Sequence, residues 1–150
     1  MTARPTMPAI SLWQPYASGF LLPEIKRHET RHWRLHPSRI GQRVAIHAAC
    51  RVLSPAKLGE EVEEATRAAF GSNWRKTLPF GAFAGSVVLG DCREMGLMIG
   101  GAEPAHDLDR LFGLWEPGRF AFRGDDPITL PTPIKAQGRQ GWFKTDLVQP

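Results

Sequence analysis

Proline and glycine recur along the whole chain and leave room only for short helices and strands. Of the 150 residues, 13 are Pro and 15 are Gly, and they are spread without an internal repeat. Proline interrupts helix interiors and central strands, whereas glycine favours turns, so such a chain divides into short elements joined by turns. The pattern is typical of a β-rich domain, and the length predicts one domain that covers residues 1–150.

The alternation of apolar and polar residues identifies the strands. In the first strand Ile10 and Leu12 point to one face, and Ser11 and Trp13 to the other. The predicted strands cover residues 9–13, 29–33, 42–49, 81–89, 119–123 and 142–147, with a further edge around Pro131 and Pro133. We expect helices at residues 16–22, from Ser54 to about Gly71 with its four glutamates facing water, and for one turn at 107–112. These elements predict an α+β fold, a small β-barrel of about six strands with two or three helices.

Composition excludes several classes of protein. No apolar run approaches the ~18 residues that a membrane span requires, so we expect no membrane partner. The first residues lack the apolar core of a signal peptide, which favours a cytoplasmic protein. Two cysteines, Cys50 and Cys92, are too few for a disulfide framework or a cysteine-based metal site. We therefore expect neither a metal nor another cofactor, and the oligomeric state stays open.

Positive charge is concentrated in one part of the chain. The net charge is +4, and 14 of the 19 basic residues are arginine. Residues 24–51 contain seven basic residues and only two acidic ones. Because the planar guanidinium group suits phosphates and base edges, this block indicates an electropositive surface for RNA or a nucleotide. A basic face that is merely solvated is the alternative.

The segment of residues 26–31, KRHETR, concentrates the candidate chemistry. If it enters a strand, Glu29, Arg31 and Trp33 share one face, and Lys26 arrives from the preceding turn. A carboxylate between two cations is expected to stay ionised, and the arginine is then aimed at a ligand. An exposed ion pair of little energetic value is the alternative.

The order of the motifs adds a family resemblance. The chain contains, in order, SLWQPYA (11–17), IKRHETRHW (25–33), VAIHAA (44–49), FGA…GSV (80–87), FGLWEPGRF (112–120) and a closing stretch at 131–142. This order resembles the ASCH domain family of PUA-like β-barrels, whose signature is GxKxxExR. The family's glycine is replaced here by Glu24. The resemblance implies a PUA-like barrel with an RNA-binding cleft that the motif lines.

On this basis we expect a single ligand site. A base would stack on the aromatic rings of Trp13, Tyr16 and Trp33. Phosphates or base edges would be bound by the cations Lys26, Arg31 and Arg119. The amide of Gln14 would hydrogen-bond to a base edge, and Glu29 is the remaining predicted ligand contact.

Two alternatives stay open at this level. The first is a hydrolase acting on RNA (a ribonuclease) or on a modified nucleoside, similar to the acetylcytidine amidohydrolases of the family. Lys26 would then be base or nucleophile, with Glu29 orienting it. Those relatives carry a threonine three residues after the lysine, where this chain has Glu29, and Thr30 follows one residue later. The second alternative is an interaction domain, as in transcription coregulators that carry this domain.

Overall fold

A single mixed sheet of six strands organises the chain. The computed structural model describes residues 6–96 and 100–146. The strands are β1 (Met7–Leu12), β2 (His28–Arg31), β3 (Arg43–Ala48), β4 (Ala82–Glu94), β5 (Phe120–Lys135) and β6 (Phe143–Thr145). Their order in the sheet is β2-β5-β4-β3-β1-β6. Among the described strands, β1 and β3 pair parallel, and the other neighbours pair antiparallel.

Short helices complete the fold. They are α1 (Tyr16–Phe20), α2 (Pro55–Leu58), α3 (Glu60–Phe70), α4 (Trp74–Thr77) and α5 (Asp107–Leu111), with one 3-10 turn at Pro37–Arg39. The predicted α+β class and the count of about six strands are confirmed, whereas the described residues hold more helices than the two or three expected. Among the described helices, none is both long and apolar enough to cross a membrane.

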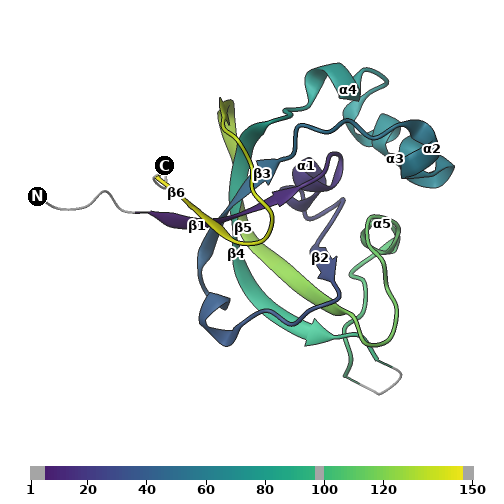
Figure 1. The fold of residues 1–150 in the computed structure, drawn as a ribbon. Helices are drawn as coiled ribbons and strands as arrows, with labels where there is room; N and C mark the ends of the chain where they lie inside the picture. The colour runs from purple at the N-terminus through teal and green to yellow at the C-terminus, as the bar shows by residue number, and fades with distance from the viewer. Residues whose placement is uncertain (1–5, 97–99, 147–150) are drawn as a thin grey trace, which may run out of the picture.

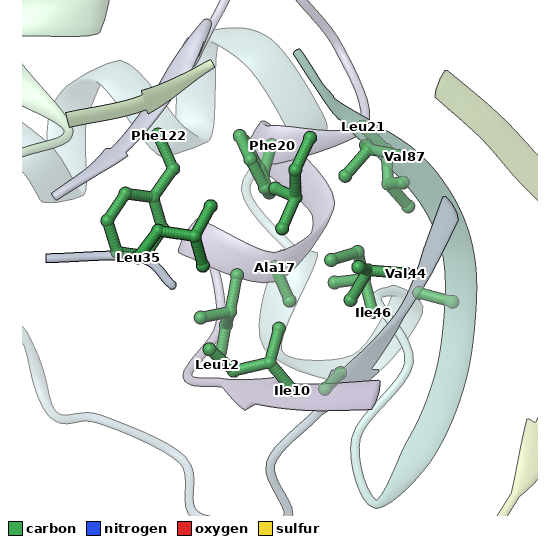
Figure 2. Packing of buried hydrophobic residues seen from close by; sticks show 13 residues of the cluster. Ile10, Leu12, Ala17, Phe20, Leu21, Leu35, Val44, Ile46, Val87 and Phe122 are labelled. Atoms are coloured by element: carbon green, nitrogen blue, oxygen red, sulfur yellow. The ribbon is translucent and has the colours of Figure 1, made fainter. Parts of the chain in front are cut away.

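The main core forms where the curved sheet closes around α1. Ile10 of β1, Val44 and Ile46 of β3, and Ala17 and Phe20 of α1 are buried together (Figures 1 and 2). Apolar residues two apart in a strand share a face, which is why these strands turn one side toward the helix. The end of β1 and the start of α1 are thereby held firmly at one rim of the sheet.

A second core lies between α1 and the remaining helices, which gather on one side of the molecule (Figure 1). Trp74 and Phe112 are its largest buried side chains. Phe112 ends α5, and its ring meets Tyr16 edge-on at 6.1 Å between ring centres. This packing fixes the segment after α5 beside β1 and β2.

Three expectations about single elements are corrected. The helix expected from Ser54 to Gly71 is two helices, because Gly59 between them has φ +93°. One of its four glutamates, Glu63, is buried rather than facing water. The expected strands at 119–123 and around Pro131 are parts of the single strand β5, and these prolines fall where its pairing with β4 is irregular.

Two strand ends are also corrected. Strand β4 runs on to Glu94 rather than ending at Leu89, because the two strands re-pair after a bulge between Leu89 and Asp91. Strand β2 ends at Arg31, so Trp33 lies outside it and does not continue the face predicted for Glu29 and Arg31.

Candidate functional site

A cleft of about 610 Å³ opens between the end of β1, strand β2 and the segment after α5; we call it the motif cleft. Its polar lining includes residues of the KRHETR segment and, from outside that segment, Arg119. Of the residues predicted as ligand-binding, those that line it are Trp13, Tyr16, Glu29, Arg31 and Arg119.

Lys26 lies beneath the cleft rather than in its lining. Its side chain is 0% exposed, and Nζ donates to the carbonyl oxygens of His28 at 2.6 Å and Phe112 at 2.8 Å. Nζ also lies 3.2 Å from Oε1 of Glu29. An ammonium group has three hydrogens, so these three acceptors use all of them. Lys26 therefore ties β2 to the end of α5 and supports Glu29 from below.

Glu29, held by Lys26, in turn orients Arg31. Its second carboxylate oxygen, Oε2, accepts from Nε of Arg31 at 2.9 Å. The Glu29 side chain is 11% exposed, whereas that of Arg31 is 29% exposed. Within the described part of the chain, the two terminal nitrogens of Arg31 have no hydrogen-bond or ion-pair partner, while the guanidinium carbon lies 5.9 Å from the ring centre of Trp33. The arginine is thus held at one nitrogen and free to bind a ligand with the other two.

Two aromatic side chains flank this group differently. Trp13 is 48% exposed, and the guanidinium carbon of Arg51 lies 5.4 Å from its ring centre. Tyr16 is only partly exposed; burial first, and then the charge of Glu29, raise the pKa of its phenol above the usual value. Trp13 therefore offers an open ring, while Tyr16 remains a neutral phenol on the wall.

Two predicted ligand contacts lie elsewhere. Gln14 is fully buried, and its amide nitrogen donates to the hydroxyl of Ser18 at 2.7 Å and the carbonyl of Pro79 at 2.9 Å. Its two amide hydrogens are therefore used inside the fold. The ring of Trp33 packs against Phe122, with ring centres 5.2 Å apart, and against Trp142. Both residues hold the frame of the cleft and do not line it.

The segment of residues 113–119 is fixed to the rest of the cleft through the backbone of Leu114. Nε of Arg119 donates to the carbonyl of Leu114 at 3.0 Å, and the hydroxyl of Thr30 accepts from the backbone N–H of Leu114 at 3.1 Å. Gly113 is required beside them, because a Cβ there would lie 2.8 Å from the indole nitrogen of Trp115 and 3.0 Å from the side chain of Thr30. Arg119 directly precedes Phe120, which pairs with Arg31 between β5 and β2, so the two arginines line the cleft from neighbouring segments.

Sequence reasoning missed the residue that anchors the KRHETR segment, Asp109 of α5. Its buried carboxylate accepts from the backbone N–H groups of Arg27 and His28, from Nδ1 of His28 at 2.7 Å and from the N–H of Ala105. Burial would raise the pKa of Asp109, but the hydrogen bonds from His28 and Ala105 outweigh it and lower that pKa to about 2. An aspartate in a short helix carries no local sign of a partner about 80 residues away in sequence.

A second cleft, of about 580 Å³, adjoins the first. It lies between the ends of β1 and β3 and the segment of residues 136–141, and we call it the loop cleft. It shares Ser11, Trp13 and Arg31 with the motif cleft. Among the described residues, no three His, Cys, Asp or Glu side chains are grouped so as to hold a metal ion.

Comparison with known proteins locates the fold. No protein-family model and no curated protein sequence matches the chain. Among solved structures, an ASCH protein from Zymomonas mobilis is 15% identical over 91% of this chain and 85% of that one, with a TM-score of 0.50. A tyrosine-to-phenylalanine mutant of that protein aligns at 16% identity over 91% and 88%, with a TM-score of 0.51. The chain therefore has the ASCH-like fold that its ordered motifs indicate.

Proposed function

We propose that this protein binds single-stranded RNA or a nucleotide in the motif cleft. The observation that carries the proposal is the clamped Arg31, whose free nitrogens lie in the same cleft as the half-exposed ring of Trp13. An arginine held in position loses little conformational freedom when it binds a phosphate. An open indole ring supplies a stacking surface that accepts any base.

The charge balance of the cleft supports an anionic ligand. The negative charge of Glu29 is offset by the buried ammonium group of Lys26 beneath it. The charges of Arg31 and Arg119 then remain uncompensated in the lining. Two cations that line the same cleft favour a phosphate as its ligand. The ASCH-like fold supports the same reading, since the sequence resemblance implies RNA binding.

The hydrolase alternative loses support from the position of Lys26. A lysine that acts as base or nucleophile needs a free, deprotonated nitrogen within reach of the substrate. Here Nζ is buried and directed at three acceptors inside the fold, so it does not reach a ligand in the cleft. The geometry of Lys26 suits a positioning role for Glu29 and Arg31. No observation favours the interaction-domain alternative.

Binding of a uridine decamer, measured by calorimetry at several salt concentrations, tests the proposal. Each phosphate contact contributes about −0.7 to the slope of log K against log salt for a single strand. We expect Arg31→Gln to weaken binding about tenfold and to reduce the slope by about one contact.

Lys57→Gln is the matched control, because Lys57 is an exposed cation on α2 outside both clefts. It should change neither quantity. Undetectable binding by the wild type, or equal effects of the two substitutions, would contradict the proposal.

A further inference from the structure

The motif cleft and the loop cleft meet at one wall. Ser11, Trp13 and Arg31 line both of them. Since Trp13 is half-exposed and Arg31 is clamped through a single nitrogen, both clefts have access to a stacking surface and to a guanidinium group. A ligand that fills the motif cleft can thus continue past Trp13 into the loop cleft.

The shared wall is held in place by a chain of hydrogen bonds. Nε2 of the buried His47 lies 2.7 Å from the carbonyl oxygen of Ala136, and its Nδ1 lies 2.9 Å from the hydroxyl of Ser11. A carbonyl can only accept, so in the neutral ring Nε2 carries the hydrogen and Nδ1 accepts from Ser11. Gly138 closes tightly over this pair, because a Cβ there would lie 2.6 Å from the imidazole ring and 3.0 Å from the hydroxyl oxygen. The part of the shared wall formed by Ser11 is therefore tightly packed, and the two clefts also adjoin at Trp13 and Arg31.

The loop cleft brings its own anion-binding groups. Arg139 lines it, is exposed, and has no protein partner within the described part of the chain. In the same part of the chain, the backbone N–H groups of residues 137–141 have no protein acceptor. Free N–H groups next to a free guanidinium group are suited to a phosphate. The loop cleft thus has a cation of its own in addition to the Arg31 that it shares with the motif cleft.

We propose that the loop cleft binds the neighbouring nucleotide of the same single strand. The ligand of this protein is then a strand of at least two nucleotides that crosses Trp13, with its linking phosphate at Arg31 and a terminal or next phosphate near Arg139. This inference rests on the proposed function and sharpens it, because a free mononucleotide fills only one of the two clefts.

Calorimetry with short ligands of both base types tests this inference. The probes are UMP and AMP against the 5′-phosphorylated dinucleotides pUpU and pApA. We expect each dinucleotide to bind about tenfold more tightly than its mononucleotide, since one more base and phosphate are engaged. Arg139→Gln should remove most of this gain and leave mononucleotide binding within twofold, whereas Lys57→Gln should change neither.

Cys50 provides a second readout that does not depend on the Arg139→Gln substitution. It is exposed and lines the loop cleft only, and Cys50→Ser identifies its signal. We expect pUpU or pApA to slow the reaction of Cys50 with N-ethylmaleimide severalfold, followed by intact-protein mass spectrometry, and UMP or AMP to have no such effect.

The outcomes separate the two proposals. If the mononucleotides bind through Arg31 but the dinucleotides bind no more tightly and leave Cys50 unprotected, the loop cleft is not a nucleotide site and the proposed function stands. If none of these short probes binds but the uridine decamer does, the inference about the loop cleft is overturned and the proposed function stands; if the decamer does not bind either, both are overturned.

Discussion

Two buried glutamates among the described residues, Glu29 and Glu63, are each placed between two cations, and Glu29 lines the motif cleft. In the layer of helices, Glu63 accepts from both terminal nitrogens of Arg75, at 2.6 and 2.8 Å, and Arg67 lies 3.3 Å away. Nε of Arg75 also donates to the carbonyl of Leu53. Every donor nitrogen of Arg75 is therefore used inside the fold.

Glu29 contacts Arg31 through one nitrogen only, unlike Glu63, which binds two nitrogens of Arg75. It shares its oxygens between Lys26 below and a single nitrogen of Arg31 above. The difference teaches that a buried carboxylate between two cations does not by itself make a binding site. The KRHETR segment differs in that its arginine is oriented by the protein and, among the described residues, keeps two nitrogens without a hydrogen-bond partner in the cleft.

Replacing the buried lysine should have the largest effect. Lys26→Met leaves the carbonyls of His28 and Phe112 and one oxygen of Glu29 without their donor. Breaking a buried charge pair on one side costs about 3–5 kcal/mol of unfolding free energy. Urea unfolding followed by circular dichroism measures this loss. A loss below about 1 kcal/mol would show that Lys26 is not the support described here.

Breaking the ion pair between Arg75 and Glu63 in the layer of helices should destabilise the protein without affecting RNA binding. Arg75→Gln removes both hydrogen bonds to Glu63 and leaves that carboxylate unpartnered on one side. Because the Arg75 side chain is 25% exposed, we expect a smaller loss of about 2 kcal/mol. Affinity for the uridine decamer, compared with wild type at a temperature where both are folded, should be unchanged. A tenfold weaker affinity of Arg75→Gln for the decamer would mean that the Glu63 group supports RNA binding as the Glu29 group does.

Acid should weaken the anchor of the KRHETR segment. The folded-state pKa of Asp109 is about 2, below its ordinary value of 3.8. A depressed carboxyl pKa stabilises the fold above the unfolded-state value, and this stabilisation is lost as the pH falls through the folded-state value. We expect a loss of about 2 kcal/mol between roughly pH 4 and pH 2.

The variant Asp109→Asn isolates this contribution. It should be less stable than wild type at pH 7, and the difference should shrink as the pH falls toward 2. Equal pH dependence of the two proteins, measured by thermal unfolding, would contradict the role given to Asp109.

The clamped arginine itself should matter least for stability. Arg31→Gln removes one hydrogen bond from a side chain that is 29% exposed. Partly exposed pairs of this kind contribute about 0–1 kcal/mol to folding. Thermal unfolding should therefore place this variant close to wild type, in contrast to Arg75→Gln. A destabilisation equal to that of Arg75→Gln would mean that the two arginines have the same structural role.

Local patterns predicted the frame of the molecule well. The alternation in residues 9–13 identified β1, and the motifs in their order indicated the ASCH-like fold. Trp13, Glu29 and Arg31 were placed on candidate faces because a strand has a period of two. That rule needs only neighbouring residues.

Contacts between distant segments explain what the sequence did not reveal. Gln14 was expected to face a ligand, but the carbonyl of Pro79 lies 65 positions away and binds its amide inside the fold. Lys26 is turned inward by Phe112, and Asp109 holds the start of β2 from α5. The direction of each of these side chains depends on contacts with residues that are distant in the sequence. The periodicity of a strand or a helix carries no information about such contacts.

The half-exposed Trp13 gives the protein a built-in optical signal at the point where the two clefts meet. Of its five tryptophans, Trp74 is fully buried, Trp33, Trp115 and Trp142 are partly buried, and Trp13 alone among them is exposed. An exposed indole emits at longer wavelengths than a buried one and is quenched when a base stacks on it. Emission at the red edge of the spectrum therefore reports the occupancy of Trp13 selectively, without any label.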